Sequence, residues 1–339
     1  MAVRLFERIS ASTQCPCCGE NTGWVIATVD GKTHENLTTI SCEGCGMGRI
    51  DPLPAEMDLE AWYSTHYRQI YKGSTKPQLR HVLRAARNAL ERLEWLQGKA
   101  LFVDSEQGSP RTLDIGASSG EFVALMKSLG CDAHGIEPHE GYASFARSLG
   151  LNVTNGSLKG SLRSMGSETF DLITMFHVLE HLSDPVGALR LIGERLSPGG
   201  RLYIEVPNAT RATSPTYMFF KAHTLYFDQT SLSNLLAAAG YDTVALNRPE
   251  EGNLRVVGRF QPEKVRQSVH RHTHPLMTAQ KERRWGRYLL SQAVQGQPFR
   301  KLAASYQEKK AANVYRDADE LLSAIYARAA LAGQVRQGQ

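Results

Sequence analysis

The 339-residue chain lacks any apolar run near the roughly 20 residues that a membrane-spanning helix needs. Its first ten residues contain no hydrophobic core of the kind that directs secretion. Low-complexity tracts are absent as well, and 42% hydrophobic with 22% charged residues is ordinary for a globular protein. These absences exclude a membrane-spanning, secreted or disordered chain. We therefore expect a cytoplasmic protein with room for about two domains.

The chain as a whole also lacks a strong excess of positive or negative charge, because its net charge is only +5. Residues 261–339 depart from this balance, with 14 Lys and Arg against 6 Asp and Glu. A basic tail can face phosphate, anionic lipid or an acidic glycan, although a solvated helix surface is the commoner explanation. The tail shows no interleaved aromatic and basic surface, so we do not expect nucleic acid as a partner.

Cysteines are few, six in all, but four of them are spaced as metal ligands. They form two C-x2-C pairs, each followed by a glycine: Cys15 with Cys18, and Cys42 with Cys45. The runs 23–29 and 37–40 between the pairs fit the hairpin of a zinc ribbon. A redox dithiol would need one pair, and disulfides are disfavoured in a cytosolic chain. The sequence thus predicts a closed, structural zinc site, with Cys17 as a spare thiol able to replace a neighbour.

Residues 51–107 form a second predicted segment, a helical linker or lid. Apolar residues recur at a helical period from 78 to 96, which predicts a helix packed against the sheet that follows. Tyr67, Tyr71 and Lys72 precede this helix and can reach over a bound ligand. Packing and lid functions both stay open for this segment.

From about residue 108 strands and helices alternate, which indicates a doubly wound α/β sheet covered on both faces. Strands are predicted at 112–115, 133–136, 151–154, 170–176 and 201–206, with a turn at 197–200 and a closing antiparallel pair at 241–246 and 254–260. Ligands bind beyond the carboxyl ends of the strands in such sheets. Polar residues gather on that rim: Asp114, Glu137, His177, Glu180, His181 and Asn208. The rim is the predicted functional site, and the polar segment 209–221 is its predicted acceptor lid.

The stretch 112–122 joins the first of these strands to a helix through a turn bounded by Gly116 and Gly120. Small residues let a backbone approach a ligand, and the start of a helix presents free N–H groups. Similar turns also serve as plain connectors, so the motif alone does not identify a cofactor. Glu137 adds to it, because an acid 23 residues after Asp114 is placed to accept hydrogen bonds from ribose hydroxyls.

Four ordered segments resemble successive motifs of the S-adenosylmethionine-dependent methyltransferases with a seven-stranded Rossmann-like fold: 113–120, 135–138, 170–182 and 196–202. The cysteine module and segment 222–241 resemble bacterial methyltransferases that act on sugars, surface glycans and related metabolites. The resemblance implies that the donor S-adenosylmethionine contacts Asp114, Gly116, Ala117, Ser118, Gly120, Glu137, Pro138, Ser157, Phe176 and His177. The chain departs from the pattern at Ser118, where a third glycine is usual, and at Ser157, where an acid often contacts the adenine amine.

Methyl transfer is an in-line displacement at the sulfonium carbon, and a hydroxyl acceptor must also lose a proton. Histidine is the usual base because it titrates near neutrality. The candidates are His177, His181 and His223, of which the last two are preferred. Glu180 can orient a histidine or bind the acceptor, and the pair Glu180 and His181 can equally serve in capping and packing.

The predicted acceptor is a sugar, a glycan or a small metabolite, with O-methylation favoured over C-methylation. Related sugar C-methyltransferases carry a large third domain, for which the helical tail of about 80 residues is too short. Two other functions stay open. A nicotinamide-dependent oxidoreductase would need the middle glycine that the turn lacks, and a non-catalytic scaffold would be consistent with Ser118 and Ser157.

Four segments follow from these patterns: a zinc-ribbon-like module at 1–50, the helical linker or lid at 51–107, a methyltransferase domain at 108–262 and a basic helical extension at 263–339. The extension is predicted to hold helices at roughly 277–295 and 298–331. Their apolar stripes fit packing on the same chain or on a second copy in a homo-oligomer, and the sequence does not decide between these.

Overall fold

The computed structural model describes residues 4–62, 77–99, 101, 108–211, 218–264, 274–283 and 297–337. Tyr67, Tyr71 and Lys72 of the predicted lid lie outside these ranges, and so do residues 212–217 of the predicted acceptor lid. The chain divides into two compact units. Unit 1 comprises Met1–Leu59, Met175–Glu194 and Leu202–Gln297, and unit 2 comprises Glu60–Thr174, Arg195–Arg201 and Pro298–Gln339.

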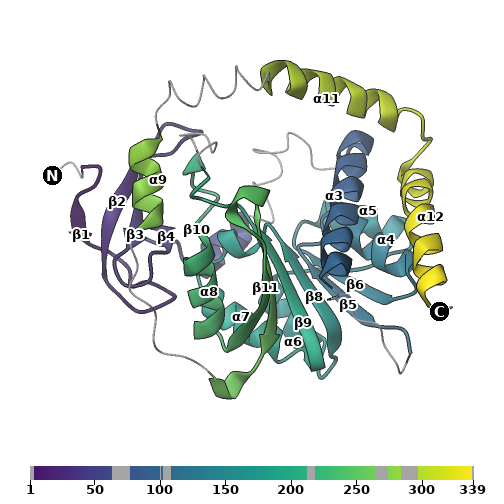
Figure 1. Cartoon of the computed structure of the whole chain (residues 1–339), viewed down its shortest axis with the longest axis horizontal. Coiled ribbons are helices and arrows are strands. Elements are labelled where there is room, and N and C mark those ends of the chain that lie inside the picture. Colours follow the sequence, from purple (N-terminus) through teal and green to yellow (C-terminus); the bar gives the residue numbers. More distant parts are fainter. Residues whose placement is uncertain are drawn as a thin grey trace. The chain divides into compact units, whose positions relative to one another are not determined.

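A seven-stranded sheet has the strand order β11-β12-β9-β8-β5-β6-β7 (Figure 1). Its strands are β5 (Arg111–Ile115), β6 (Asp132–Glu137), β7 (Asn152–Asn155), β8 (Phe170–Phe176), β9 (Leu196–Val206), β11 (Tyr241–Leu246) and β12 (Leu254–Phe260). β6 pairs in parallel with β5 and β7, whereas β12 pairs antiparallel with β9 and β11. The predicted α/β class and the closing antiparallel pair are confirmed.

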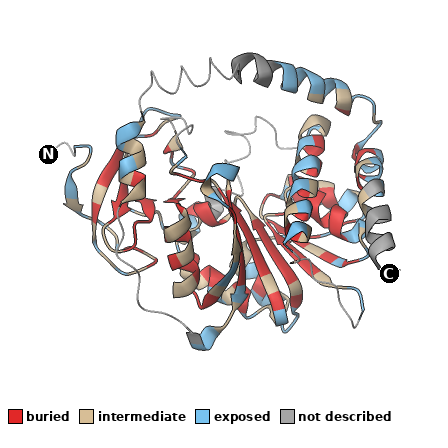
Figure 2. Cartoon of the chain, in the orientation of Figure 1, coloured by how far each residue is buried: buried red, intermediate tan, exposed pale blue. Residues whose placement is uncertain are grey.

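The helices between these strands are α4 (Glu121–Ser128), α5 (Glu140–Ser148), α6 (Leu158–Ser164), α7 (Pro185–Gly193) and α8 (Gln229–Ala238). Short helices are α1 (Glu56–Trp62), η2 (Leu179–His181), η4 (Pro249–Glu251) and η5 (Pro262–Lys264). Figure 2 shows that buried residues run along most of the sheet. The central strands read as apolar runs because both of their faces are covered. No helix among the described residues is long and apolar enough to cross a bilayer.

The glycine-rich segment 197–200 is part of strand β9 and not the turn that its sequence predicts. Gly199 has a φ of 84°, which bends the strand locally without ending it. The neighbouring β8 holds the segment in place, because Ser197 Oγ donates to Asp171 Oδ1 at 2.5 Å. A Cβ at Gly200 would lie 2.9 Å from the carbonyl oxygen of Phe170, so glycine permits this close pairing.

Unit 2 is completed by α3 (Leu79–Gly98) and by the C-terminal α12 (Ala318–Gln337). Helix α12 contacts both α3 and α4, and Figure 1 shows the three helices together. Tyr326 Oη donates to the carbonyl oxygen of Glu121 at 2.9 Å. Leu321 and Leu322 are buried with it. The apolar stripe of this helix therefore packs within its own chain.

The predicted helix 298–331 is divided into α11 (Gln297–Ala312) and α12. Asp317 begins the second helix, because its Oδ1 accepts a hydrogen bond from the backbone N–H of Glu320 at 2.9 Å. The other predicted tail helix starts as α9 (Pro275–Glu282), and residues 284–295 of that prediction lie outside the described part of the chain.

Unit 1 contains a second sheet of five strands in the order β1-β2-β3-β4-β10. These strands are β1 (Arg8–Ser10), β2 (Thr22–Val29), β3 (Asn36–Cys42), β4 (Gly48–Ile50) and β10 (Leu225–Tyr226). The predicted hairpin is confirmed as the antiparallel pair β2 and β3. Strand β10 was not predicted, and it brings a segment far along the chain into the sheet of the cysteine module.

Candidate functional site

The glycine turn after β5 is fastened to the neighbouring strand β6 within unit 2. The backbone N–H groups of Gly116 and Ala117 donate to the carbonyl oxygen of Ile136 at 2.8 and 2.9 Å. The φ angles are 77° at Gly116, 53° at Ser118 and 86° at Gly120, all in the left-handed region. Ser118 thus adopts the conformation for which glycine is usual, at a cost of about 1–2 kcal/mol.

Glu137, the last residue of β6, accepts hydrogen bonds from two backbone N–H groups. Its Oε2 accepts from the N–H of Ser118 at 2.9 Å, and its Oε1 accepts from the N–H of His139 at 3.0 Å. The carboxylate is thereby fixed at the end of β6, and a carboxylate only accepts hydrogen bonds. This is the chemistry that ribose hydroxyls require.

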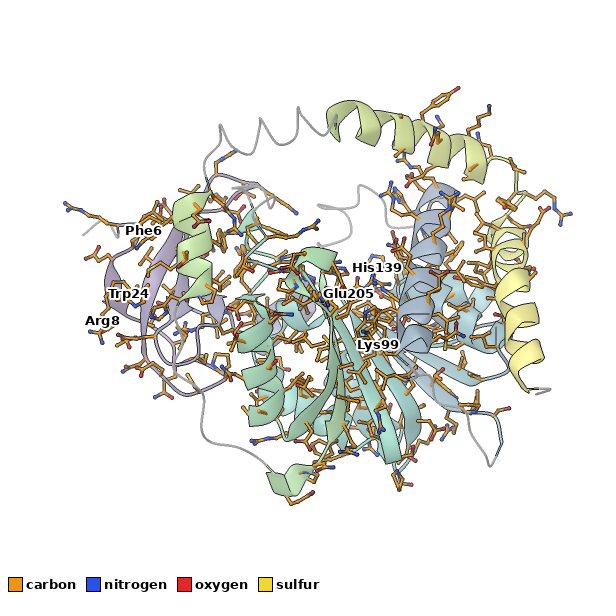
Figure 3. All side chains as sticks on the ribbon, in the orientation of Figure 1. Phe6, Arg8, Trp24, Lys99, His139 and Glu205 are labelled. Atoms are coloured by element: carbon orange, nitrogen blue, oxygen red, sulfur yellow. The ribbon has the colours of Figure 1, made fainter. Side chains whose placement is uncertain are left out.

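His139, labelled in Figure 3, is a site residue that the sequence did not reveal. Its side chain is buried, and its Nδ1 has no hydrogen-bond partner among the residues that the structure describes. A buried, unpaired ring nitrogen beside an acid costs free energy unless a ligand pairs with it. The side chains of Glu137 and His139 therefore fit the hydrogen-bonding groups of a nucleoside such as that of S-adenosylmethionine.

Asp114 is buried at the end of β5 and accepts a hydrogen bond from Thr174 Oγ1 at 2.6 Å. Burial raises the pKa of its carboxyl to about 7, and the Thr174 hydroxyl only partly opposes this. Asp114 therefore changes charge near neutral pH.

Three further residues that were predicted to contact S-adenosylmethionine have defined neighbours: Ser157, Pro138 and Phe176. Ser157 caps helix α6, because its Oγ accepts from the N–H of Gly160 at 3.3 Å. Asn155 Nδ2 donates to the carbonyl oxygen of Pro138 at 3.0 Å. In unit 1, the Phe176 ring packs edge-on against Tyr203, with centroids 5.1 Å apart. The predicted adenine contact at Ser157 stays a prediction.

His177 begins the histidine-rich segment of unit 1, with a φ of 56° that is unusual for a side-chain-bearing residue. Its Nδ1 lies 3.2 Å from Glu180 Oε1, and its Nε2 lies 3.2 Å from Oε1 of Glu205, labelled in Figure 3. Burial lowers the pKa of His177, but hydrogen bonds to both carboxylates outweigh it and raise the pKa to about 9. His177 is a cation at neutral pH and is a poor base there.

Glu205 is a second site residue that the sequence analysis missed, because it lies inside an ordinary strand pattern. Besides His177, it pairs with Arg255, whose Nε lies 2.9 Å from Oε2. Asn253 Nδ2 donates to Oε1 at 3.2 Å. The predicted rim residue Asn208 has a local role, since its Oδ1 accepts from the N–H of Thr210 at 3.0 Å.

Glu180, His181 and His223 come together in unit 1, with ligand-type atoms all within 4.8 Å of one another. His181 Nδ1 lies 2.6 Å from the carbonyl oxygen of Ala222, so Nδ1 carries the proton and Nε2 the lone pair. The two imidazole rings have centroids 4.9 Å apart. The predicted base candidates His181 and His223 are therefore neighbours.

Burial sets the charges of this cluster. It lowers the pKa of His181, and it lowers that of His223 to about 3, because the two rings would also repel each other if both were protonated. Burial opposes ionisation of Glu180, but the hydrogen bond from His177 wins and lowers its pKa to about 2. At neutral pH the cluster is one carboxylate beside two neutral imidazoles.

The segment that carries His223 is held by the cysteine module within unit 1. The N–H of Thr224 donates to the carbonyl oxygen of Glu180 at 2.9 Å. Strand β10 follows at once and pairs with β4. Lys32, from the loop between β2 and β3, places its Nζ 3.5 Å over the ring of Phe220, which packs against His223 with centroids 4.2 Å apart.

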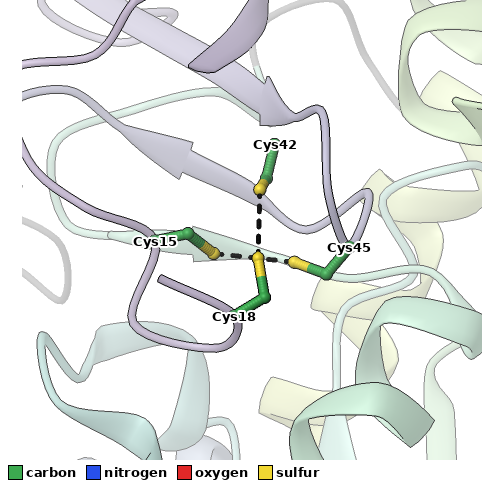
Figure 4. A group of neighbouring side chains, drawn as sticks. All are labelled: Cys15, Cys18, Cys42 and Cys45. Carbon is green, nitrogen blue, oxygen red and sulfur yellow. Dashed lines mark hydrogen bonds between the residues drawn. The ribbon is translucent and has the colours of Figure 1, made fainter. Parts of the chain in front are cut away.

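The four predicted zinc ligands converge in unit 1 (Figure 4). Cys15 Sγ lies 3.5 Å from Cys45 Sγ, and Cys18 Sγ lies 3.5 Å from Cys42 Sγ. Four thiolates about 2.3 Å from a tetrahedral zinc lie about 3.8 Å apart, so the set fits this metal. Hydrogen bonding with Cys15 lowers the pKa of Cys42 and raises that of Cys45, because thiolates so close need a cation to ionise together. Cys17 is outside the quartet.

A family model described as a methyltransferase domain matches residues 53–246, more than half of the chain. Two curated proteins similar to it are ubiquinone biosynthesis O-methyltransferases. That of Xanthomonas axonopodis pv. citri (strain 306) is 29% identical over 126 residues, which are 36% of this chain and 51% of that protein. That of Bordetella avium (strain 197N) is 31% identical over 125 residues, 34% and 49% respectively. The chain spans about half the length of these relatives.

Solved structures of methyltransferases are also similar to the chain. The 1,6-didemethyltoxoflavin-N1-methyltransferase of Burkholderia thailandensis is 20% identical with a TM-score of 0.46, covering 66% of this chain and 96% of that one. The magnesium protoporphyrin IX methyltransferase of Synechocystis PCC 6803 is 11% identical with a TM-score of 0.44, covering 61% and 100%.

Proposed function

We propose a substrate for this chain, which belongs to the methyltransferase-domain family and is an S-adenosylmethionine-dependent enzyme. It methylates a hydroxyl oxygen of a sugar, a glycan or a related small metabolite. The observation that carries this proposal is the cluster of two neutral imidazoles beside an ionised Glu180. A hydroxyl needs a proton acceptor during methyl transfer, and an amine or a carbanion does not. The family match favours this function over the nicotinamide-dependent and the non-catalytic alternatives.

Unit 2 supplies the proposed donor site. S-adenosylmethionine, when bound, supplies a methyl group on a positively charged sulfur. Glu137 is assigned the ribose hydroxyls, since its carboxylate is already fixed by the N–H groups of Ser118 and His139. His139 Nδ1 is assigned a hydrogen bond to the same nucleoside. The small residues Gly116 and Ala117 keep the turn narrow where the ligand approaches.

Unit 1 supplies the proposed proton acceptor. His181 is preset for this role, because the Ala222 carbonyl fixes the proton on Nδ1 and leaves the lone pair on Nε2. His223 is the second candidate, and its lowered pKa keeps its ring neutral at physiological pH. As the acceptor oxygen forms its bond to the methyl carbon, one of these rings takes the hydroxyl proton. His177 already carries a proton and is assigned to holding Glu180 and Glu205 in place.

Two observations support an oxygen on a sugar-like metabolite as the acceptor. The cysteine module resembles that of bacterial methyltransferases that act on sugars and glycans. Two relatives, each matched over about a third of this chain, are named O-methyltransferases.

The test is release of S-adenosylhomocysteine by the full chain with a panel of free sugars, nucleotide sugars and small hydroxylated metabolites. His181→Ala or His223→Ala should lower turnover about 10²-fold for the ring that is the base, with donor affinity unchanged by calorimetry. His134→Ala is the matched control, since His134 pairs with the surface residue Asp132 in unit 2. Normal turnover in both cluster variants would contradict the assigned base.

A further inference from the structure

The carboxylate of Glu180 has one oxygen that none of the described residues satisfies. Its Oε1 lies 3.2 Å from His177 Nδ1, but its Oε2 is buried and has no hydrogen-bond partner in the described part of the chain. The side chain is only 1% exposed. An ionised oxygen withdrawn from water without a partner is costly, so this position calls for a cationic or hydrogen-bonding ligand.

Two imidazoles stand beside this carboxylate in the form that metals bind. His181 donates its Nδ1 proton to a backbone carbonyl, the arrangement that commonly orients a metal-ligating histidine through its other nitrogen. The ring of His223 is neutral, as a ligand must be. The donor atoms of Glu180, His181 and His223 lie within 4.8 Å of one another.

We propose that Glu180, His181 and His223 form a second metal site, for a divalent transition-metal ion such as Zn²⁺, separate from the four-cysteine site. Two histidines and a glutamate are a known zinc set that leaves a position open for a further ligand. Ligands about 2.0–2.1 Å from a tetrahedral zinc lie about 3.3 Å apart, so the three side chains draw together by roughly 1 Å on binding. The charges that face the cluster are His177, held by Glu180 and Glu205, and the Lys32 ammonium over Phe220.

The open position gives the metal a role that rests on the proposed function. The metal would lower the pKa of an acceptor hydroxyl bound there, which would give its proton to solvent water. The resulting oxygen would form a bond to the methyl carbon of the donor, while the carbon–sulfur bond would break and leave its electron pair on sulfur. With the metal bound, the two imidazoles would be its ligands and solvent water would replace them as the proton acceptor, whereas in the metal-free chain they keep the role of base given above. Metal binding needs neither donor nor acceptor and can be measured without them.

The experiment measures the zinc content of the purified full chain and of Glu180→Gln and His223→Ala. We expect two zinc equivalents per wild-type chain and one in each variant. His134→Ala, the histidine control in unit 2, should retain two. The cysteine-bound equivalent reports that unit 1 is folded in the variants. One equivalent in the wild type after saturation with zinc would overturn the proposal, as would two in both cluster variants.

Cobalt titration of the zinc-depleted wild type gives a readout that needs no variant. The cysteine site should show intense thiolate-to-cobalt absorption, and the second equivalent should add only weak visible bands of nitrogen and oxygen ligation. Saturation after the thiolate signal alone would overturn the second site. That result, with methyl transfer lost in His223→Ala, would leave the base assignment standing. Two bound metals with no hydroxyl acceptor methylated would instead contradict the proposed function and not the metal site.

Discussion

In the glycine turn, both the backbone conformation and the packing at position 120 require a glycine. The φ of +86° at Gly120 disfavours any side chain, and an added Cβ would lie 2.6 Å from Leu151 Cδ1. Gly120→Ala should therefore lower the free energy of unfolding by about 2–4 kcal/mol, combining backbone strain with overpacking. Urea denaturation would measure it.

Gly130 separates the two contributions. It has a φ of +83° but nothing within 4 Å of an added Cβ. Gly130→Ala should cost only the backbone part, about 1 kcal/mol. Equal losses in the two variants would mean that the collision with Leu151 contributes nothing.

Asp114 makes stability depend on pH in a definite direction. Its pKa is about 7 in the folded chain, above the value near 3.9 of an unfolded chain. Between these values the folded state binds more protons, so stability falls as pH rises from about 4 to 7 and is flat above. Raising the pKa of Asp114 from about 3.9 to about 7 corresponds to about 4 kcal/mol at most.

Asp114→Asn removes this group and keeps a partner for Thr174. The difference in unfolding free energy between wild type and Asp114→Asn should therefore shift against the wild type by up to about 4 kcal/mol between pH 4 and pH 8. Chemical denaturation across that range measures the difference. A pH-independent difference would show that the carboxyl is not held near pKa 7.

At the scale of elements, the strand pair β4 and β10 joins the cysteine module to the segment of His223. Loss of zinc should therefore disturb the position of the proposed base His223, although no cysteine lies in the cluster of Glu180, His181 and His223. Cys42→Ser should lower zinc content and reduce methyl transfer about 10-fold or more, because the ribbon sheet that holds residues 222–226 loses its metal. Donor binding, assigned to unit 2, should survive in calorimetry.

Cys17→Ser is the matched control for this experiment. Cys17 is buried near the quartet but is outside it. It should keep both zinc and turnover. A zinc-depleted Cys42→Ser enzyme with full turnover would show that the module does not position His223.

Elements with a strong local pattern were predictable, and elements fixed by distant partners were not. The five central strands and the hairpin β2–β3 carry their own apolar periods. Strand β10 has only two residues and exists because β4 pairs with it. The segment 197–200 has the sequence of a turn but is part of strand β9, where a hydrogen bond to β8 holds it. The same contrast holds in the site. Glu205 and His139 could not be predicted as site residues, because only their surroundings in space mark them as such.

At the scale of the whole molecule, the C-terminal helix ties the end of the chain to α4. Tyr326 Oη reaches the carbonyl oxygen of Glu121 and its ring is buried. Tyr326→Phe should lower the unfolding free energy by about 1 kcal/mol, and Tyr326→Ala by about 3–5 kcal/mol. Tyr306→Ala, at a side chain 72% exposed on α11, should stay within about 0.5 kcal/mol. Thermal unfolding that ranks Tyr326→Ala with Tyr306→Ala would contradict this packing.

The shared sheet also sets an order of events during synthesis. Strands β1 to β4 leave the ribosome early, but β10 follows β4 by about 175 residues. At about 5–20 residues per second, β4 waits roughly 9–35 s for its partner. Throughout that interval the growing chain presents an unpaired strand edge, which is a template for wrong pairing between nascent chains. A chaperone that covers this edge, or early zinc loading that rigidifies it, would protect the chain until residue 226 has been made.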